Sequence, residues 1–429
     1  MLEMKDSGVE WIGAIPSRWS TVQLGSIFSE HKHKNTGMQS NNLLSLSYGN
    51  IVRKDINTLD GLLPESFEGY NVIGPGDIVL RLTDLQNDQR SLRVGICREK
   101  GIVTSAYVTL RRRTPSMNSQ FFYYLIHSYD VRKGFYGMGA GVRQGLNYAG
   151  IKKIALPLPS AGEQSRIVLL LNEKHAQIDA LIQNVQTQIE KLKAYKQSLI
   201  TEVVTKGLDP TVPMKDSGVE WLGDIPEKWQ MRKANTLSER IVVGVVIRPS
   251  EYFDIKGTIP FLRGLNVKDY QISTENLVYI TEQSNQLLSK SIVNEGDILI
   301  VRDGNIGASC IVPPELAGAN VVSMIIFTAN SECTSPYICY CLNSLVGKHQ
   351  FELSKIGSAL THTSVSAVSR LVFPLPAVEE QNCITAYLEK KCAQIDRLVA
   401  IKQAKIEKLE QYKRSLIYEY VTGKKEVRL

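Results

Sequence analysis

The sequence lacks any apolar run long enough to cross a membrane. Its longest candidates, such as Val321–Phe327, fall far short of the roughly 20 residues that a spanning helix needs. The N-terminus reads MLEMKDSGVE and shows no apolar core of a secretory signal. We therefore expect a cytoplasmic protein with no membrane partner.

Cysteine and histidine are both scarce. The seven cysteines are scattered without a C-x-x-C pair, and no histidine flanks Cys333, Cys339 and Cys341 at zinc-finger spacing. The six histidines come close together only at His31 and His33. This pattern predicts reduced, buried thiols and no metal site.

Motifs of catalysis and of nucleotide binding are missing as well. There is no G-x-x-x-x-G-K-[ST] phosphate loop and no H-E-x-x-H helix. Phe135–Gly139 spells F-x-G-x-G, a pattern that methyltransferases use for cofactor binding, but no clear strand precedes it and no N-P-P-[FY] motif accompanies it. We predict no catalytic residue and no cofactor bound by this chain.

The overall composition is ordinary for a globular protein. Of 429 residues, 43% are hydrophobic and 22% are charged, and the net charge is +7. The length gives room for two or three domains, each with its own core. The mild positive charge is compatible with a polyanionic partner but does not require one.

What the sequence does contain is an internal repeat. Met4–Trp19 (MKDSGVEWIGAIPSRW) and Met214–Trp229 (MKDSGVEWLGDIPEKW) are identical at twelve of sixteen positions. Ile189–Ile200 (IEKLKAYKQSLI) and Ile406–Ile417 (IEKLEQYKRSLI) are identical at nine of twelve positions. A repeat this long indicates duplicated domains rather than a solenoid of short units.

All four tryptophans lie in the first pair of repeated segments, which we call the opening blocks. Trp11 and Trp19 bracket a Gly and a Pro in the first block, and Trp221 and Trp229 do so in the second. Large aromatic side chains usually act as buried anchors. We expect these residues to fix the path of the chain into each domain rather than to contact a ligand.

Between the repeated segments the two halves diverge. Residues 20–155 and 230–372 consist of short β-branched runs separated by Gly, Pro, Asn and Asp, which predicts strands and turns. We expect a Gly-Asp turn that leads into an apolar strand within both Ile73–Leu80 and Val293–Ile300, and further strands at Gly101–Leu110 and Ala319–Phe327. Short helices are expected at Ser119–Ser128 and Pro336–Leu345. Each insert closes with a Pro-x-Pro exit, at Pro157–Pro159 and Pro374–Pro376, which stiffens the chain.

A long helix is predicted after each insert. The first begins with the capping-box pattern Ser160–Glu163 and runs to about Thr205, and the second runs from about Glu379 to about Val421. Apolar residues recur every seven positions on both, which favours coiled-coil packing, although Lys402 interrupts the seam. Because the chain must return between its halves, we expect the two helices to pack antiparallel.

The predicted fold class is α+β. It comprises two mostly β domains separated by a pair of long antiparallel coiled-coil helices, with a pseudo-twofold internal repeat. The expected β-rich domains are residues 1–158 and 207–375, and the expected helical regions are residues 159–206 and 376–429.

Side chains suited to nucleic-acid recognition gather in the loops of the inserts. Arginine binds guanine bidentately, and asparagine or glutamine binds adenine. Loops 140–147 and 358–364 occupy matching places before the two Pro-x-Pro exits. Any single arginine is more often a phosphate contact or a solvated residue than a base reader. The candidate DNA-binding residues are Arg81, Arg90, Arg93, Arg143, Gln144, Asn147, Arg263, Asn266, Lys268, Arg302, Asn305, Thr361, His362 and Thr363.

The complete pattern resembles the specificity subunit of type I restriction–modification systems. It consists of DSGVEW–IP–W, a divergent β-rich insert, Pro-Leu-Pro with Glu-Gln and Ile, and a helix ending in KL–YK–SLI, all given twice. The motif residues are Pro157–Pro159, Glu163, Gln164 and Ile167 in the first half, and Pro374–Pro376, Glu380, Gln381 and Ile384 in the second. The resemblance covers essentially the whole chain.

This resemblance implies a non-catalytic subunit with two target-recognition domains, each of which reads one half of a split DNA site. Its partners would be double-stranded DNA, two methyltransferase subunits and motor–nuclease restriction subunits. S-adenosylmethionine, ATP and Mg are expected on those partner subunits. The helices would set the spacer and dock the methyltransferase subunits. The candidate partner-binding residues are Leu171, Ile178, Ile182, Ile189, Leu388, Ile395, Val399 and Ile406.

Two other classes of function stay open from the residues alone. One is a scaffold that carries two β-rich protein-binding heads on a coiled-coil strut, and the other is a self-sufficient enzyme. A steep loss of DNA affinity with rising salt would distinguish a DNA-binding protein from the scaffold. Cofactor binding by this chain alone would be required of the enzyme.

Overall fold

The structure is a computed structural model that describes residues 3–57, 64, 66–85, 88, 91–138, 145–355 and 362–427. The chain divides into two compact units. Unit 1 comprises residues 1–186 and 404–429, and unit 2 comprises residues 187–403. Each unit contains both sheets and helices, which confirms the predicted α+β class.

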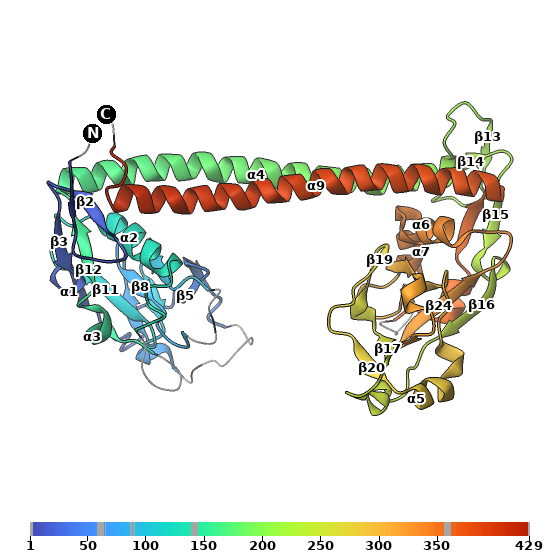
Figure 1. Cartoon of the computed structure of the whole chain (residues 1–429), viewed down its shortest axis with the longest axis horizontal. Helices are drawn as coiled ribbons and strands as arrows, with labels where there is room; N and C mark the ends of the chain where they lie inside the picture. The colour runs from blue at the N-terminus through green and yellow to red at the C-terminus, as the bar shows by residue number, and fades with distance from the viewer. Residues whose placement is uncertain are drawn as a thin grey trace. The chain divides into compact units, whose positions relative to one another are not determined.

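Unit 1 is built on a four-stranded antiparallel sheet with the strand order β4-β11-β8-β9. Strands β8 and β11 of this sheet are labelled in Figure 1. The strands are β4 (Phe28–Glu30), β11 (Val108–Arg112), β8 (Ile78–Leu80) and β9 (Val94–Ile96). Helix α2 (Ser119–Val131) packs beside β9 and joins the same hydrophobic core. Every residue of β8 is buried, as its uninterrupted apolar sequence predicts.

Short two-stranded sheets and two single-turn helices complete unit 1. The pairs are β1 (Met4–Asp6) with β2 (Ala14–Pro16), β3 (Ser20–Gln23) with β12 (Ala155–Leu158), β5 (Leu44–Ser47) with β6 (Asn50–Arg53), and β7 (Asn71–Ile73) with β10 (Gly101–Val103). The helices are α1 (Leu24–Ile27) and α3 (Tyr148–Ile151). The β5–β6 hairpin packs against β9 at Gly95, where a β-carbon would lie 2.6 Å from the Leu46 side chain.

Unit 2 repeats this framework with a four-stranded sheet in the order β16-β24-β21-β22. The strands are β16 (Ser238–Val243), β24 (Met324–Ala329), β21 (Ile298–Val301) and β22 (Ser309–Ile311). Helix α6 (Ser335–Asn343) packs beside β22 as α2 packs beside β9. The hairpin of β18 (Val267–Lys268) and β19 (Gln271–Ile272) contacts β22 as the β5–β6 hairpin contacts β9.

The remaining elements of unit 2 are short. The strands are β13 (Met214–Asp216) with β14 (Asp224–Pro226), β15 (Gln230–Lys233) with β25 (Val372–Leu375), and β17 (Ile259–Leu262) between β20 (Val278–Ile280) and β23 (Asn320–Val321). The helices are α5 (Glu282–Leu287), α7 (Leu345–Lys355) and α8 (Val365–Ser369). The predicted short helices are confirmed, and so are the apolar strands β8 and β21 after the two Gly-Asp turns. The predicted strands Gly101–Leu110 and Ala319–Phe327 are each divided into two strands, β10 with β11 and β23 with β24, which belong to different sheets.

The long helices are also confirmed. Helix α4 spans Ala161–Lys206 and α9 spans Val378–Val421, within one residue of the predicted ends. The predicted capping box is present, because Ser160 Oγ accepts from the Glu163 N–H at 3.3 Å and the Glu163 carboxylate accepts from the Ser160 N–H at 3.3 Å.

Within each unit the segments of α4 and α9 pair antiparallel. In unit 1, Lys413 contacts Asp179 at 2.6 Å, and in unit 2, Lys196 contacts Asp396 at 2.7 Å. These four residues are the same pair given twice at an offset of 217. Lys402, which interrupts the apolar seam, donates to Gln188 of α4 at 2.5 Å. The interruption is therefore a polar cross-link between the helices.

The compact units do not separate the long helices from the β-rich parts. Both α4 and α9 begin in one unit and end in the other. The division into residues 1–158, 159–206, 207–375 and 376–429 describes expected roles rather than packing, and it stays a prediction.

Candidate nucleic-acid interface

One hydrogen bond ties each opening block to the start of a long helix. In unit 1 the indole N–H of Trp19 donates to the Glu163 carboxylate at 3.2 Å, and in unit 2 Trp229 donates to Glu380 at 3.1 Å. Both indoles are buried, which confirms their predicted role as anchors. Trp221 is partly exposed, so burial is complete for only one tryptophan of its block.

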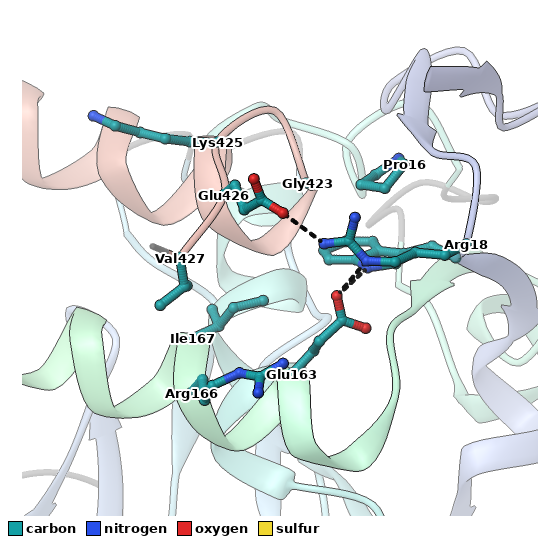
Figure 2. Close-up of a pocket in the computed structure, with 10 residues that line it drawn as sticks. Pro16, Arg18, Glu163, Arg166, Ile167, Gly423, Lys425, Glu426 and Val427 are labelled. Atoms are coloured by element: carbon teal, nitrogen blue, oxygen red, sulfur yellow. Dashed lines mark hydrogen bonds and ion pairs between the residues drawn. The ribbon is translucent and has the colours of Figure 1, made fainter. Parts of the chain in front are cut away.

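In unit 1 this joint includes the segment that follows α9. The Arg18 guanidinium donates to Glu163 at 2.7 Å and to Glu426 at 3.3 Å (Figure 2). Arg166 and Val427 line the same pocket of about 380 Å³. The opening block, the start of α4 and the last described residues are thereby held together.

The glutamine after each of these glutamates is buried and bonds in two directions. Gln164 donates to the carbonyl of Pro159 at 3.0 Å and accepts from the backbone N–H of Asn118, the N-cap of α2, at 2.9 Å. Gln381 makes the equivalent contacts in unit 2, at 3.0 Å to Pro376 and 2.8 Å from the N-cap of α6. The repeated Glu-Gln motif therefore fixes the Pro-x-Pro exit and the short helix of each unit.

In each unit one backbone hydrogen bond connects the loop after β8 or β21 to the loop before the Pro-x-Pro exit, and the bond lies at the equivalent position in both units. In unit 1 the Leu146 N–H donates to the carbonyl of Leu82 at 2.8 Å. In unit 2 the Thr363 N–H donates to the carbonyl of Arg302 at 3.1 Å. Leu82 and Arg302 each lie four residues after the first residue of the equivalent strands β8 and β21. These loops supply most of the predicted DNA contacts.

The unit 1 candidates differ in exposure. Arg81 is half-buried, and its guanidinium has no hydrogen-bond or ion-pair partner among the residues that the structure describes. Asn147 is exposed, but its side chain caps α3 by accepting from the Gly150 N–H at 3.1 Å. The candidates Arg90, Arg143 and Gln144 lie outside the described residues.

Arg93 is a structural residue, which corrects its prediction as a DNA contact. Its side chain has no exposed surface, and its guanidinium donates to the carbonyls of Thr83 at 2.6 Å, of Asp84 at 3.3 Å, and of Asp88. A buried guanidinium with these partners cannot reach a base or a phosphate. It instead holds the loop after β8 in place.

In unit 2 three predicted residues leave buried polar atoms without a partner. Arg263 Nε, Arg302 Nε and Thr363 Oγ1 are buried and unpaired among the described residues. Asn305 is exposed and His362 is half-buried, so both are accessible from solvent. Unpaired donors beside accessible side chains fit a surface that a polar ligand completes. Thr361, the remaining candidate of this loop, lies outside the described residues.

The three candidates near β18 have different roles. Asn266 is fully buried, and its amide donates to the carbonyls of Ser273 and Glu275 at 3.1 Å each, so its prediction as a DNA contact is corrected to a turn-stabilising role. Arg263 is half-buried and donates to a backbone carbonyl at 2.6 Å. Lys268 is exposed. Only Lys268 of this group is fully accessible.

The predicted partner-binding residues lie mostly inside the helix pair. Ile182 and Val399 are half-buried. The other six are less than a tenth exposed and belong to the seam or the unit cores: Leu171, Ile178, Ile189, Leu388, Ile395 and Ile406. The heptad rule found the seam correctly, but a residue in the seam contacts the neighbouring helix and cannot dock a separate subunit. The prediction is corrected accordingly.

Four exposed apolar residues of the helices form a repeated pair that the site prediction missed. In unit 1 Leu181 and Tyr412 are each 52% exposed, and in unit 2 Leu398 is 48% and Tyr195 58% exposed. Leu398 and Tyr412 are the counterparts of Leu181 and Tyr195 at an offset of 217. The contact of Asp179 with Lys413 places Leu181 and Tyr412 at nearly the same level of their helices. The sequence repeat itself was the available signal.

Neither a metal-binding cluster nor a membrane-spanning helix is found among the described residues. Among them, no group of three or more His, Cys, Asp and Glu side chains could hold a metal ion. No helix in this part of the chain combines the length and the apolar character that crossing a membrane requires.

The comparisons with known proteins agree with the geometry. Residues 226–411 match a family model described as "Type I restriction modification DNA specificity domain". The type I restriction enzyme MjaVIII specificity subunit of Methanocaldococcus jannaschii is 23% identical over 419 residues, covering 96% of this chain and 93% of that protein. The EcoBI specificity subunit of Escherichia coli is 23% identical over 310 residues, covering 70% of this chain and 65% of that protein.

A solved structure shows the same fold. A chain from work described as "Structural basis underlying complex assembly and conformational transition of the type I R-M system" aligns with a TM-score of 0.67 at 16% identity, covering 95% of this chain and 98% of that one. The family match covers most of the second half of the chain, and the structural match covers both halves. In sequence the chain is similar to type I restriction–modification specificity subunits, and residues 226–411 match the specificity-domain model of that family.

Proposed function

We propose that this chain is the DNA-recognition subunit of a type I restriction–modification complex, in which unit 1 reads one half of a two-part DNA site and unit 2 reads the other. One observation carries the proposal. The Trp–Glu and Gln contacts of the frame are repeated, at 3.2 and 3.1 Å for the indoles, whereas the loops that the two units carry are different in sequence. One frame with two different recognition surfaces fits an asymmetric, bipartite target.

The loop chemistry suits double-stranded DNA. Arg81 in unit 1 offers a guanidinium without a partner among the described residues, and Arg302 in unit 2 has a buried Nε without one. A guanidinium can bind guanine O6 and N7 or a phosphate, and an exposed lysine such as Lys268 can neutralise a phosphate. These are the residues to which we assign DNA contact, together with Asn305 and His362.

The repeated exposed pairs suit a partner that binds twice. We assign Leu181 with Tyr412, and Tyr195 with Leu398, to the docking of two methyltransferase subunits. Motor–nuclease subunits would join the same complex. The chain would contribute recognition without catalysis, and S-adenosylmethionine, ATP and Mg would belong to the partner subunits.

The long helices would set the spacer between the half-sites. Removing residues 185–191 and 401–407 deletes one heptad from each helix while keeping the seam in register. Seven residues of helix are about 10 Å long, which corresponds to at most about three base pairs of DNA. We expect a shorter spacer with both half-sites unchanged. An unchanged spacer would contradict this part of the proposal.

The test of half-site reading is methylome sequencing of a host that carries the complete complex. Arg302→Gln should relax the half-site read by unit 2, and Arg81→Gln should relax the half-site read by unit 1, each by about 1–3 kcal/mol of discrimination. Lys290→Gln, at an exposed lysine of unit 2 outside these loops, is the matched control and should leave the motif unchanged.

Two outcomes would contradict the assignment. In the first, both arginine variants alter the same half-site. In the second, the purified complex binds DNA with an affinity that does not fall with salt, which would favour the protein-binding scaffold.

A further inference from the structure

Unit 1 contains a cavity of about 860 Å³ where its β-rich part meets the long helices. Its wall comes from α2, α4, α9 and the tip of the β5–β6 hairpin. The residues used in the argument are Gly49, Tyr124, His127, His175, Lys413 and Arg414. None of the DNA contacts assigned above lies in this wall.

In unit 2 an aromatic ring occupies the equivalent place. Tyr340 lies six residues after the N-cap of α6, as Tyr124 lies six residues after the N-cap of α2. Tyr270 packs on Tyr340 with ring centroids 5.1 Å apart, and Lys196, the counterpart of Lys413, lies 5.8 Å from its ring. The equivalent residues of unit 1, Tyr124 and Lys413, line the cavity.

The difference is traced to one turn residue. Gly49 and Tyr270 are each the second residue of a two-residue hairpin turn, because Ser47 pairs with Asn50 and Lys268 pairs with Gln271. Both adopt a left-handed backbone, with φ of 81° and 67°. Unit 1 thus has a hydrogen atom where unit 2 has a phenol ring. The preceding residue, Tyr48, is 72% exposed and does not fill the space.

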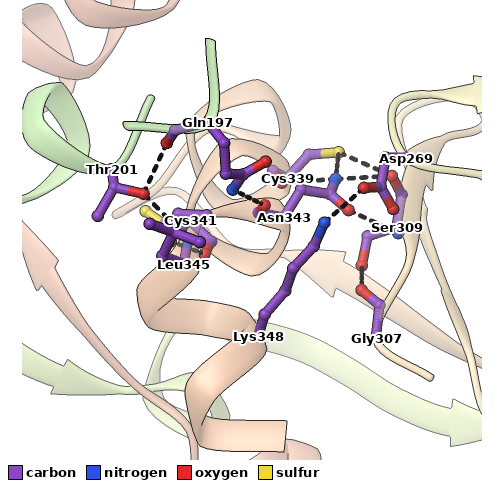
Figure 3. A network of polar contacts seen from close by, with 11 residues as sticks. Gln197, Thr201, Asp269, Gly307, Ser309, Cys339, Cys341, Asn343, Leu345 and Lys348 are labelled. Atoms are coloured by element: carbon purple, nitrogen blue, oxygen red, sulfur yellow. Dashed lines mark hydrogen bonds and ion pairs between the residues drawn. The ribbon is translucent and has the colours of Figure 1, made fainter. Parts of the chain in front are cut away.

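Several polar groups next to this place are paired in unit 2, although the Tyr270 hydroxyl and Asp269 Oδ1 are buried without a partner among the described residues. The Asn343 amide donates to the Ser309 carbonyl at 2.8 Å and accepts from its N–H at 3.0 Å, and Gln197 donates to the Asn343 carbonyl at 2.7 Å (Figure 3). Asn343 corresponds to His127, since both lie nine residues after the N-cap. The Nδ1 of His127 is buried without a partner among the described residues.

The imidazole of His175 also has a ring nitrogen without a hydrogen-bond partner among the described residues, and its other contact shows whether that nitrogen is a donor or an acceptor. The Tyr124 hydroxyl donates to Asn172 Oδ1 at 2.7 Å, so its oxygen accepts from His175 Nδ1 at 3.4 Å. Burial lowers the pKa of His175 to about 4, so the ring is neutral at pH 7. A neutral imidazole that donates from Nδ1 has an acceptor at Nε2. The His175 Nε2 is buried and unpartnered among the described residues.

We propose that this cavity binds a planar aromatic molecule that carries an O–H or N–H donor. The ring takes the place that Tyr270 occupies in unit 2, and the donor bonds to Nε2 of His175. This site is separate from DNA reading, and its ligand is a small molecule of the phenol, indole or aminoheterocycle class.

The experiment uses the full chain and two probes of the same shape, 4-methylphenol and toluene, in calorimetric titrations. We expect one saturable site for 4-methylphenol and about five- to tenfold weaker binding of toluene, since one hydrogen bond contributes about 1 kcal/mol. His175→Leu should abolish the preference between the probes. Gly49→Tyr should abolish binding of both by supplying the ring internally.

A second variant covers the case in which Gly49→Tyr does not fold, because a β-carbon at Gly49 would lie 3.1 Å from Leu92. Tyr270→Gly should create a second site, and that site should not prefer 4-methylphenol, because Cys392 stands where His175 stands in unit 1. Absence of saturable binding to the wild-type chain would overturn the proposal. Equal affinity for the two probes in the wild type would do so as well.

Discussion

Trp19 and Glu163 lie 144 residues apart and share a hydrogen bond of 3.2 Å at the point where the opening block of unit 1 meets α4. Arg18 bonds the same carboxylate at 2.7 Å. Burial alone would raise the pKa of the Glu163 carboxyl, but bonds from Arg18, Trp19 and Ser160 together lower it below its usual value. The ionised carboxylate therefore stabilises the fold, and protonation at low pH should remove that stabilisation.

The first prediction concerns the stability of unit 1 against pH. Because the pKa of Glu163 is lower in the folded than in the unfolded chain, its contribution is complete above the unfolded value of about 4.3 and is lost as the pH falls through the folded value. Glu163→Gln should destabilise the chain by about 1–2 kcal/mol at pH 7 and by progressively less below pH 4. Thermal unfolding across this range measures the difference.

The exposed carboxylate of Glu426 provides the control for this prediction. Among the residues that the structure describes, it bonds to Arg18 alone, at 3.3 Å, with both side chains nearly half exposed. Glu426→Gln should therefore change the melting temperature much less than Glu163→Gln does. Equal effects of the two substitutions would show that the buried Trp19 bond has no special weight.

The frame of the molecule was readable from the sequence because its signals are local and repeated. The heptad spacing and the capping box at Ser160 predicted the ends of α4 within one residue. The Gly-Asp turn at Gly296 and Asp297 predicted the start of a buried strand, and β21 begins directly after it at Ile298. Such features depend on periodicity and on backbone chemistry, which a single sequence carries.

The site was less readable because residue type does not determine side-chain direction. Arg93 and Asn266 have the chemistry of base readers, yet both are fully buried and hold turns. Ile178 was predicted to dock a partner because it lies on the apolar face of α4, but packing within the chain buries that side chain. Direction and burial come from tertiary packing, so the sequence could name the loops but not the contacts.

The second prediction separates a loop-holding arginine from a DNA-contacting one. Arg93→Ala leaves the carbonyls of Thr83, Asp84 and Asp88 without their buried donor, so we expect a loss of about 3 kcal/mol in unit 1 and weaker reading of one half-site. Arg81→Ala should weaken the same half-site without changing the melting temperature. Thermal unfolding and DNA titration on the same samples distinguish the two. An unchanged melting temperature for Arg93→Ala would refute the structural role.

The third prediction concerns the two histidines of the unit 1 cavity. Burial lowers the pKa of His127 and of His175 to about 4, and the nearby Lys413 acts in the same direction on both. The Arg414 charge also lowers the pKa of His127, whereas Asp179 raises that of His175. Since the unfolded side chains titrate near 6.5, the unfolded chain binds more protons between pH 6.5 and 4, and stability falls over that window.

Unit 2 supplies the substitutions that test this. It carries Asn343 and Cys392 where unit 1 carries the histidines, so the double variant His127→Asn, His175→Cys should flatten the pH dependence between 6.5 and 4. The expected change is at most about 3 kcal/mol for each histidine. Melting temperatures at pH 4.5 and 7.5 measure it. Parallel curves for the variant and the wild type would mean that these histidines do not carry the acid sensitivity.

The fourth prediction tests the repeated apolar pairs as docking sites. Leu181→Glu with Tyr412→Glu should remove one of two methyltransferase subunits from the complex, and Leu398→Glu with Tyr195→Glu should remove the other. All four changes together should leave this chain without either subunit, while its own affinity for DNA stays the same. Native mass spectrometry of the reconstituted complex counts the subunits directly.

The control for docking is Leu169→Glu. Leu169 is 68% exposed, more than any of the four, but its counterpart at the offset of 217 is Ala386, so it is not part of a repeated pair. If exposure of an apolar side chain were sufficient for docking, this variant would also lose a methyltransferase subunit. Because two copies of one partner need two copies of one surface, we expect Leu169→Glu to retain both subunits, and loss of either would shift the docking surface away from the Leu–Tyr pairs.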